Sequence, residues 1–480
     1  MAPSPERDDD ADMTTVTASS TIDRAHWQER LSALARMHLV PGAALGILRV
    51  GPDGDDDRVE ASYGVLSKAT GVEATTDTLF QIGSITKIWT TTLAMQLVEQ
   101  GRLHLDRPVV EVLPELRLSD PEAAAQVTLR HLLTHTSGID GDVFIDTGRG
   151  DDCLRGYVDR LGEVAQIFPV GATWSYCNTG FSVLGRMIEE VTGQVWDAVL
   201  RERLTGPLGL AHVATLPEEA LLFRTAVGHM AKGGEEPQPA TVWCMERSGG
   251  PAGSIMSTSV GDLLAFARMH LTGGRAADGT QVLGEEHARL MRRHQAEVPG
   301  RHGIADSWGL GWMRFDWDGH QLIGHDGNTL GQSAFLRLLP EQGLVVALLT
   351  NGGHTRDLYG DLYGEVFAEL AGVQLPAPFT PPDPAPSIDP SRHAGRYEIA
   401  GLVVEVSEQD GRAHLRATDT SIFADVVPDP VQEYELHPVE DGLYAIREPG
   451  EQTWEPVTFF ELADDRPFLH LSGRSIPKSG

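Results

Sequence analysis

Three short motifs hold the residues of this chain whose types and spacing could carry out acyl transfer. The first sets a serine three positions before a lysine at an expected helix start, which puts a nucleophilic hydroxyl beside an amine that can accept its proton. The second sets a tyrosine two positions before an asparagine, a proton-relay group followed by an amide that can hold a substrate. The third sets a histidine two positions before a glycine, where a strand edge leaves room for a substrate backbone. The motifs are Ser84-Ile85-Thr86-Lys87, Tyr176-Cys177-Asn178 and His325-Asp326-Gly327.

The serine of the first motif has two interpretations. Ser84 follows Gly83 and opens a stretch to Gln100 whose apolar residues recur at helical spacing, so it suits a helix N-cap. It also suits a nucleophile whose own backbone N–H stabilises an oxyanion. Lys87 favours the nucleophile, because burial in an apolar stretch lowers the pKa of an amine and makes it a base. A second match, Ser475-Ile476-Pro477-Lys478, contains a proline that forbids a regular helix turn, and we interpret it as accidental.

Composition excludes several classes of function. The 480 residues carry a net charge of −31, which disfavours nucleic acid and anionic membrane surfaces as partners. The three cysteines show neither metal-ligand spacing nor a disulfide framework. His131 and His135 stand four apart but lack a third ligand nearby, so no metal site is predicted. No apolar run is long enough to span a bilayer. The acidic, polar N-terminus does not read as a secretory signal, so a cytoplasmic location is expected.

The order of the predicted elements indicates an α+β architecture. A helix over 22–38 and strands over 43–50 and 58–65 come from the beginning of the chain. Three more strands (321–324, 332–339 and 344–350) and a helix over 356–370 come from far downstream. A mostly helical region, about 90 to 310, separates these halves. An antiparallel sheet built from both halves and flanked by helices forms a cleft in which the third motif can face the first two.

A proline-rich stretch divides the chain. Residues 376–390 predict a stiff linker, and the alternating segments beyond it predict a small antiparallel barrel or sandwich. The expected layout is a disordered acidic N-terminus over 1–20, a catalytic domain over 21–375, the linker, and a barrel domain over 391–480. The barrel is interpreted either as a stabilising appendage or as a lid that narrows the cleft.

The three motifs together resemble those of the penicillin-binding protein and serine β-lactamase superfamily, in its class C-like, H-x-G branch. The resemblance covers roughly 25–372, and the barrel is similar to the lipocalin-like domain attached to several relatives. Three further stretches also resemble sequences of this superfamily: His131–Gly138, Pro207–Leu210 and Gly253–Thr258.

The resemblance implies roles by position. Ser84 would form an acyl-enzyme, with Lys87 and Tyr176 exchanging the proton. Asn178 would bind the substrate amide, and the backbone N–H groups of Ser84 and Asn328, the residue after Gly327, would form the oxyanion hole. His325 replaces a lysine that is always charged, which puts classical penicillin turnover in doubt.

The resemblance leaves the reaction open. The favoured expectation is a penicillin-binding-protein-type thioesterase that releases and macrocyclises a nonribosomal peptide through a D-configured residue. The alternatives are a D-stereospecific peptidase, aminopeptidase or esterase and, more remotely, a non-catalytic receptor for a peptide or β-lactam. The expected partner is a small peptidyl substrate, supplied free or by a carrier protein, with no cofactor, no nucleic acid and no membrane. The acyl acceptor and the oligomeric state are not predicted.

Overall fold

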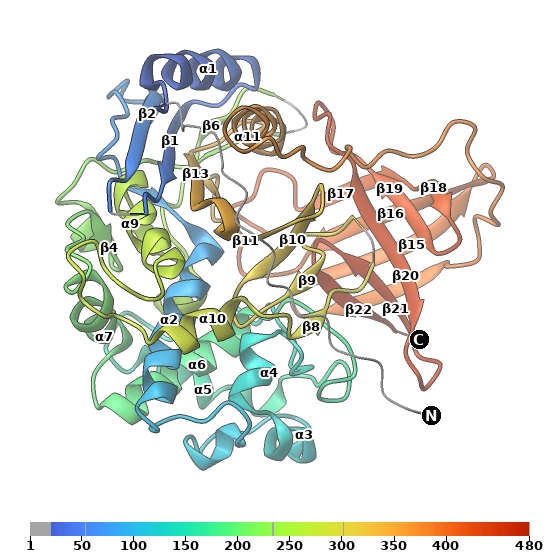
Figure 1. Ribbon diagram of the computed structural model, residues 1–480. Helices are drawn as coiled ribbons and strands as arrows, with labels where there is room; N and C mark the ends of the chain where they lie inside the picture. The colour runs from blue at the N-terminus through green and yellow to red at the C-terminus, as the bar shows by residue number, and fades with distance from the viewer. Residues whose placement is uncertain (1–20, 53, 233–234, 301, 480) are drawn as a thin grey trace, which may run out of the picture.

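The computed structural model describes residues 21–52, 54–232, 235–300 and 302–479. The N-terminal segment over 1–20, for which disorder was predicted, lies outside the described residues. Two bodies stand side by side in Figure 1: a larger one that mixes helices with a sheet, and a smaller one built from strands. The predicted α+β fold class is confirmed for the first body, and an antiparallel near-barrel follows it.

The central sheet is antiparallel and draws on both ends of the larger body. Its strand order is β2-β1-β13-β12-β11-β10-β9-β8. The first strand pairs, from Ala43 with Thr350 to Arg49 with Leu344, with a strand about 300 positions downstream. The bounds are β1 (Gly42–Arg49), β2 (Asp57–Gly64), β8 (Ala296–Glu297), β9 (Ser307–Trp308), β10 (Met313–Trp317), β11 (His320–Asn328), β12 (Ser333–Leu339) and β13 (Leu344–Thr350).

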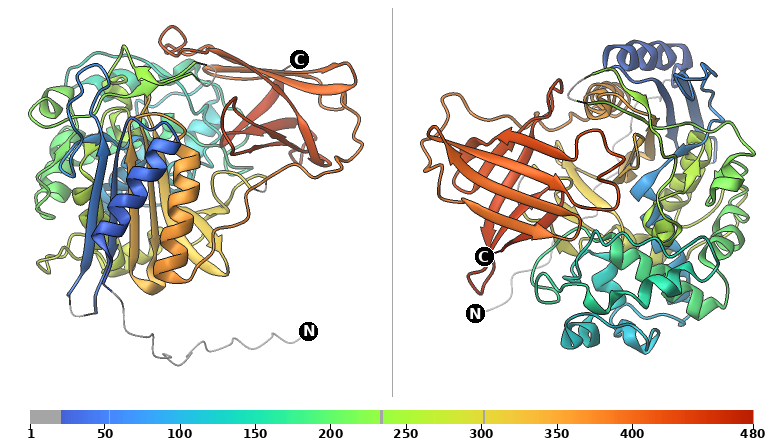
Figure 2. Two further views of the ribbon diagram at one scale, coloured as in Figure 1. Left: turned by 90° about the horizontal axis from the view of Figure 1, so that it is seen from above. Right: turned by 180° about the vertical axis from the view of Figure 1, so that it is seen from behind.

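Alternation along β1 sends side chains into two cores, one on each face of the sheet. Ala44 and Leu48 join the core shared with α2 (Thr86–Glu99) and α9 (Val260–Leu271). Ala43, Leu45 and Ile47 join the core that holds α1 (Arg24–Met37) and α11 (Thr355–Ala371). Successive strand residues point to opposite faces, so a run that is apolar throughout is buried on both sides. The left view of Figure 2 shows α1 and α11 side by side over one face.

A helical region covers the face of the sheet on which α2 lies, and it carries the second motif at the start of α6. The remaining helices are α3 (Pro121–Gln126), α4 (Leu129–Leu133), α5 (Cys153–Val158), α6 (Asn178–Thr192), α7 (Trp196–Leu200), α8 (Pro217–Ala220) and α10 (Glu285–Arg292). Small accessory sheets combine β3 (Phe80–Gln81), β7 (Ser257–Thr258) and β4 (Val213–Ala214), and β5 (His229–Met230) with β6 (Gln238–Pro239).

Nine described strands form the C-terminal near-barrel, in the order β17-β16-β15-β14-β22-β21-β20-β19-β18. The two edge strands, β17 and β18, are consecutive in the chain and are separated only by Leu436, which is buried in the barrel core. The sequence pattern predicts one strand over 434–437, which is wrong, because β17 ends at Glu435 and β18 begins at His437. The bounds are β14 (Gly395–Ile399), β15 (Leu402–Gln409), β16 (Arg412–Asp419), β17 (Val431–Glu435), β18 (His437–Glu440), β19 (Leu443–Ile446), β20 (Glu455–Glu461), β21 (Pro467–Leu471) and β22 (Arg474–Ser479).

Strand β22 holds the barrel against the larger body. The Gly473 carbonyl, just before this strand, accepts from the Tyr176 N–H at 2.9 Å. Ser475 donates its N–H to Ser175 Oγ at 3.1 Å and its hydroxyl to the Trp174 carbonyl at 2.8 Å. The second S-x-x-K match therefore lies in a strand and not in a helix, as its proline predicted. Its serine, Ser475, forms hydrogen bonds that connect the barrel to the larger body.

Candidate active site

Ser84 lies in a tight 3₁₀ turn, Gly83–Ile85, directly before α2. The end of β11 presses against this turn so closely that side chains are excluded. A Cβ placed on Gly327 would lie 1.9 Å from the Ile82 carbonyl oxygen and 2.9 Å from the Ser84 nitrogen, and one on Gly83 would lie 2.5 Å from the Asn328 nitrogen. Glycine at both positions thus brings the backbone amides of Ser84 and Asn328, the predicted oxyanion-hole pair, to one place.

Lys87 is fully buried one turn into α2, with its amine directed at the serine. Lys87 Nζ lies 3.1 Å from Ser84 Oγ, 2.6 Å from Asn178 Oδ1 and 2.6 Å from the Ala252 carbonyl oxygen. These contacts bring Ser84 and Lys87 of the first motif together with Asn178 of the second. The ammonium form would donate to all three acceptors, whereas the neutral amine can accept the serine proton.

The charge state of this amine is set by its surroundings. Burial lowers the pKa of Lys87 well below its usual range, and Arg474 lowers it further, while Asp142 acts in the opposite direction. A low dielectric disfavours the charged form, so the neutral amine becomes accessible at moderate pH. Lys87 is therefore equipped to take a proton from Ser84.

Asn178 begins α6, and both ends of its amide are engaged. Its oxygen accepts from Lys87, and its Nδ2 donates to Asp142 Oδ1 at 2.7 Å. The predicted contact with a substrate amide would have to replace one of these bonds or add to them. Cys177, the residue before, is buried, and its sulfur accepts from the Gly180 N–H at 3.2 Å, which caps the helix.

The Tyr176 ring is buried between the two bodies and stacks on His135, with ring centroids 4.4 Å apart. His135 also accepts the Cys177 N–H at its Nδ1, at 3.0 Å, and so fixes the turn that carries the tyrosine. The Tyr176 hydroxyl is buried without a hydrogen-bond partner among the described residues. Burial raises the pKa of Tyr176, and the nearby Ser84 hydroxyl lowers it by less. The group is therefore a phenol at neutral pH.

His325 lies on β11 and is fully buried. Its Nδ1 is 2.6 Å from the Asp326 carbonyl oxygen, and because a carbonyl only accepts, Nδ1 carries the proton. Its Nε2 is buried with no partner among the described residues. Burial lowers the pKa of His325 to about 3, with Lys87 lowering it as well. The imidazole is thus neutral, and it offers an acceptor where a lysine would offer a charge.

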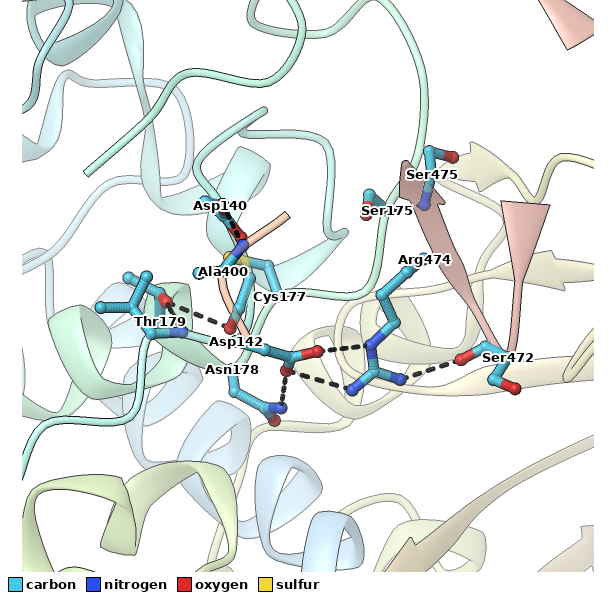
Figure 3. A network of polar contacts seen from close by, with 12 residues as sticks. Asp140, Asp142, Ser175, Cys177, Asn178, Thr179, Ala400, Ser472, Arg474 and Ser475 are labelled. Carbon is cyan, nitrogen blue, oxygen red and sulfur yellow. Dashed lines mark hydrogen bonds and ion pairs between the residues drawn. The ribbon is translucent and has the colours of Figure 1, made fainter. Parts of the chain in front are cut away.

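Two charged residues that the motifs did not reveal complete this site. Arg474, on β22, donates to Asp142 from Nε at 2.8 Å and from Nη2 at 3.1 Å, and its guanidinium stands over the Tyr176 ring at 4.9 Å. Figure 3 shows the continuous line of polar contacts from the barrel through Arg474 and Asp142 to Asn178. The paired residues are 332 positions apart, so no local pattern could reveal them.

A cavity of about 420 Å³ opens above the serine, between the two bodies. The larger body contributes Ser84, Asn178 and Asn328 to its wall, and the barrel contributes Thr453–Pro456 and Ser472–Arg474. The barrel thus forms part of the cavity wall. Among the described residues, no group of three potential metal ligands occurs. His131 instead faces Thr128 at the start of α4, with Nδ1 3.2 Å from the Thr128 nitrogen.

Comparison with known proteins agrees with this geometry. The beta-lactamase family model matches residues 27–368, and the chain belongs to this family. It is 49% identical over 382 residues to penicillin-binding protein 4 of Amycolatopsis lactamdurans, covering 79% of this chain and 99% of that protein. The resemblance drawn from the motifs is thereby confirmed, and the protein is a serine acyl-transfer enzyme of the β-lactamase and penicillin-binding protein class.

Solved structures extend the likeness to the barrel. The crystal structure of SurE, also determined with D-Leu, superposes with a TM-score of 0.72 at 29% identity, over 95% of this chain and 99% of that one. A D-stereospecific amidohydrolase from Streptomyces sp. gives a TM-score of 0.56 at 26% identity and covers 73% of this chain and 99% of that one. No helix in the described part of the chain is long and apolar enough to cross a membrane.

Proposed function

We propose that this protein is a peptidyl thioesterase that forms an acyl-Ser84 intermediate and releases a peptide by macrocyclisation. The observation that carries this proposal is the place of the barrel, whose Arg474 and Thr453–Pro456 share one cavity with Ser84. The likeness to SurE spans 95% of this chain, and SurE was solved with D-Leu, which supports a D-configured residue at the acyl position. A peptidyl thioester on a carrier protein in the cytoplasm is the substrate we infer.

In the first half-reaction, the neutral Lys87 amine takes the Ser84 proton as Oγ attacks the thioester carbonyl. The carbonyl oxygen becomes an oxyanion between the N–H groups of Ser84 and Asn328. One such donor contributes about 3–4 kcal/mol in other acyl-transfer enzymes. The C–S bond then breaks, and the thiol leaves with the proton, passed from Lys87 through the Tyr176 phenol.

In the second half-reaction, the N-terminal amine of the bound peptide attacks the acyl-Ser84 carbonyl. The amine loses a proton through Tyr176 to Lys87, and the proton returns to Ser84 Oγ as the ester bond breaks. An amine tethered to its own acyl group has a high effective concentration, which favours ring closure over attack by water. The cavity has walls from both the larger body and the barrel, and these walls would hold the peptide in a folded-back conformation.

The test is a peptidyl thioester with a C-terminal D-residue and an N-terminal amine. It is compared with its L-epimer, and intact mass reports the acyl-enzyme. We expect cyclic product from the D-form and a single adduct that Ser84→Ala abolishes. The control, Ser391→Ala, lies beyond the catalytic elements and should keep the adduct. Linear acid alone from every thioester would contradict ring closure, and an adduct on Ser84→Ala would contradict the nucleophile.

A second candidate is a D-stereospecific hydrolase that penicillin also acylates. It is favoured by the 49% identity to a penicillin-binding protein and by the likeness to a D-stereospecific amidohydrolase. Rapid hydrolysis of D-aminoacyl anilides, together with a stable fluorescent-penicillin adduct on Ser84, would support it over the thioesterase.

A further inference from the structure

Glu246 lies in the wall of the cavity that contains Ser84, at the start of the segment Arg247–Ala252. The last residue of that segment, Ala252, supplies the carbonyl oxygen that Lys87 contacts. Gly249 leaves room for the carboxylate, since a Cβ placed there would lie 2.7 Å from Glu246 Oε1. The carboxylate and the nucleophile therefore belong to one cavity, although the acyl-transfer steps do not use Glu246.

Within the described chain, no ion pair is formed by the Glu246 carboxylate. Its Oε2 is buried without a hydrogen-bond partner among the described residues. The adjacent Arg247 is directed elsewhere, to Asp197 at 2.9 Å and Asp151 at 3.0 Å. The cavity's other carboxylates have cationic neighbours in the described chain: Asp326 is 2.6 Å from Arg337, and Glu455 is 3.8 Å from Arg356.

A buried carboxyl group without a partner is costly, and a bound cation would offset that cost. The cavity also suits an amine on an apolar stem, because its lining includes Val143, Phe144, Tyr157 and Met245. We propose that Glu246 binds an ammonium group of the peptidyl substrate and so selects the peptide that enters the cavity. This inference rests on the proposed function, since it gives the same site a charge preference.

The protonation state of Glu246 agrees with this role. Burial raises the pKa of Glu246 to about 7, its own backbone N–H lowers it, and the charge of Asp146 raises it. The other titratable groups that respond to its charge are Tyr157 and Cys244. No cation contributes to the shift, so an incoming ammonium group would stabilise the carboxylate and lower this pKa. Preference for a cationic substrate should therefore strengthen as pH rises through about 7.

The test compares Glu246→Gln with the wild type on matched peptidyl thioesters. One pair differs by N-terminal acetylation, and a second pair differs by a lysine replaced with norleucine. The rate of acyl-Ser84 formation is compared, because acetylation also removes the amine that attacks later, and in the wild type we expect this rate to favour one ammonium-bearing peptide at least tenfold. Glu246→Gln should remove that preference while leaving the uncharged peptides within about twofold. The pair that responds identifies the ammonium group as the N-terminal amine or the basic side chain.

A protection assay keeps the inference testable if no thioester is turned over. D-leucinamide and its N-acetyl form compete with a fluorophosphonate for Ser84, and intact mass reports labelling. Stronger protection by the amine form, lost in Glu246→Gln and kept in the exposed control Glu286→Gln, supports the inference. Equal protection by both forms in the wild type overturns it, as does an equal loss for all peptides in Glu246→Gln. Glu246→Asp, which keeps the charge, should keep stronger protection by the amine form, and Glu246→Ala replaces the glutamine variant should that variant fail to label.

Discussion

At the scale of single residues, the site is organised around the buried Lys87 amine, whose surroundings disfavour its charged form. Lys87 contacts three oxygen acceptors, yet burial and Arg474 both lower its pKa. The charge of Arg474 lowers the pKa of Lys87 and the charge of Asp142 raises it, so the two effects partly cancel while both residues are present. Removing the arginine alone should make the charged form easier to reach.

We therefore predict that Arg474→Gln shifts the acid limb of activity to higher pH. The pKa of Lys87 rises when the arginine is removed and Asp142 loses its cation, so more base is needed to free the amine. The measurement is the rate of fluorophosphonate labelling of Ser84 against pH, with a shift of about one unit expected. Arg356→Gln, another cavity arginine, should leave the limb in place. A downward shift in Arg474→Gln would contradict this electrostatic explanation.

A second prediction at this scale concerns stability in acid. His270 is fully buried between Phe266 and Trp312, and burial lowers its pKa from 6.5 to about 3. The unfolded chain takes up this proton first, so the stability that the neutral ring contributes is lost as pH falls from about 6.5 towards 3. At pH 5 the loss amounts to about 2 kcal/mol.

The check is a series of thermal melts of His270→Gln and the wild type between pH 4 and 8. The glutamine does not titrate and can still reach Thr92, which lies 3.2 Å from the imidazole Nε2. Relative to the wild type, the Tm of the variant should rise as the solution becomes more acidic. A constant difference across the range would show that the ring does not titrate on unfolding.

At the scale of elements, the hairpin between β21 and β22 carries Arg474 into the site. Its turn residues, Ser472 and Gly473, both have positive φ, at 46° and 81°. The same pattern occurs at Asp410 and Gly411, with φ of 50° and 79°, between β15 and β16. Paired positive φ values suit a two-residue turn whose twist matches the strands.

These two turns provide a matched pair of variants. Gly473→Ala and Gly411→Ala should each cost about 1 kcal/mol, because both place a Cβ at positive φ. A Cβ at Gly473 would also lie 2.9 Å from Ile304 Cδ1, whereas one at Gly411 has no atom within 4 Å. Only Gly473→Ala should therefore lower kcat/KM, by about tenfold, through displacement of Arg474. Urea unfolding and steady-state kinetics measure the two effects, and an equal kinetic loss in both variants would refute the local explanation.

Elements with strong local patterns could be predicted from the sequence. The strand Leu344–Thr350 has the predicted bounds, because an apolar run with clear ends specifies it. The strands Arg412–Asp419 and Glu455–Glu461 were missed, since charged residues and prolines obscure their alternation. Their pairing comes from neighbouring strands, which a local pattern does not record.

The candidate site also contains residues that the sequence could predict and residues that it could not. The motifs indicated Ser84, Lys87 and Asn178, and the structure brings these three into contact. Arg474 and Glu246 carry no spacing signal, because their positions depend on how the barrel and a distant loop meet the helical region. Residues that chemistry requires at fixed spacing are readable from a sequence, whereas residues supplied by tertiary contacts are not.

At the scale of the whole molecule, the ion pair between Asp142 and Arg474 is one of several that link the catalytic body to the barrel, and it is less exposed than the pair between Arg356 and Glu455. Asp142 and Arg474 are mostly buried, with side-chain exposures of 15% and 24%. Removing one partner leaves a buried charge without compensation, at a cost of about 3–5 kcal/mol, whereas removing both leaves none. We predict that Asp142→Asn and Arg474→Gln each lower the free energy of unfolding by more than half of this cost. The double variant should lose clearly less than their sum.

Urea titrations of the four proteins, followed by tryptophan fluorescence, measure this coupling. The exposed pair Arg412 and Glu435, which lies within the barrel, is the comparison and should give a coupling below about 1 kcal/mol. Additive losses for Asp142 and Arg474 would mean that the two charges are stabilised separately. Two unfolding transitions would show that the barrel and the catalytic body unfold independently.

The position of β22, far downstream of the catalytic motifs, also bears on how the protein is made. A ribosome delivers Asp142 332 residues before Arg474, so the nascent chain carries Ser84 and Lys87 long before the arginine exists. The cavity wall is finished only when this strand takes its place between β14 and β21. A truncated or stalled product would hold the nucleophile without its completed pocket. The order of translation therefore places completion of the cavity wall after the synthesis of β22.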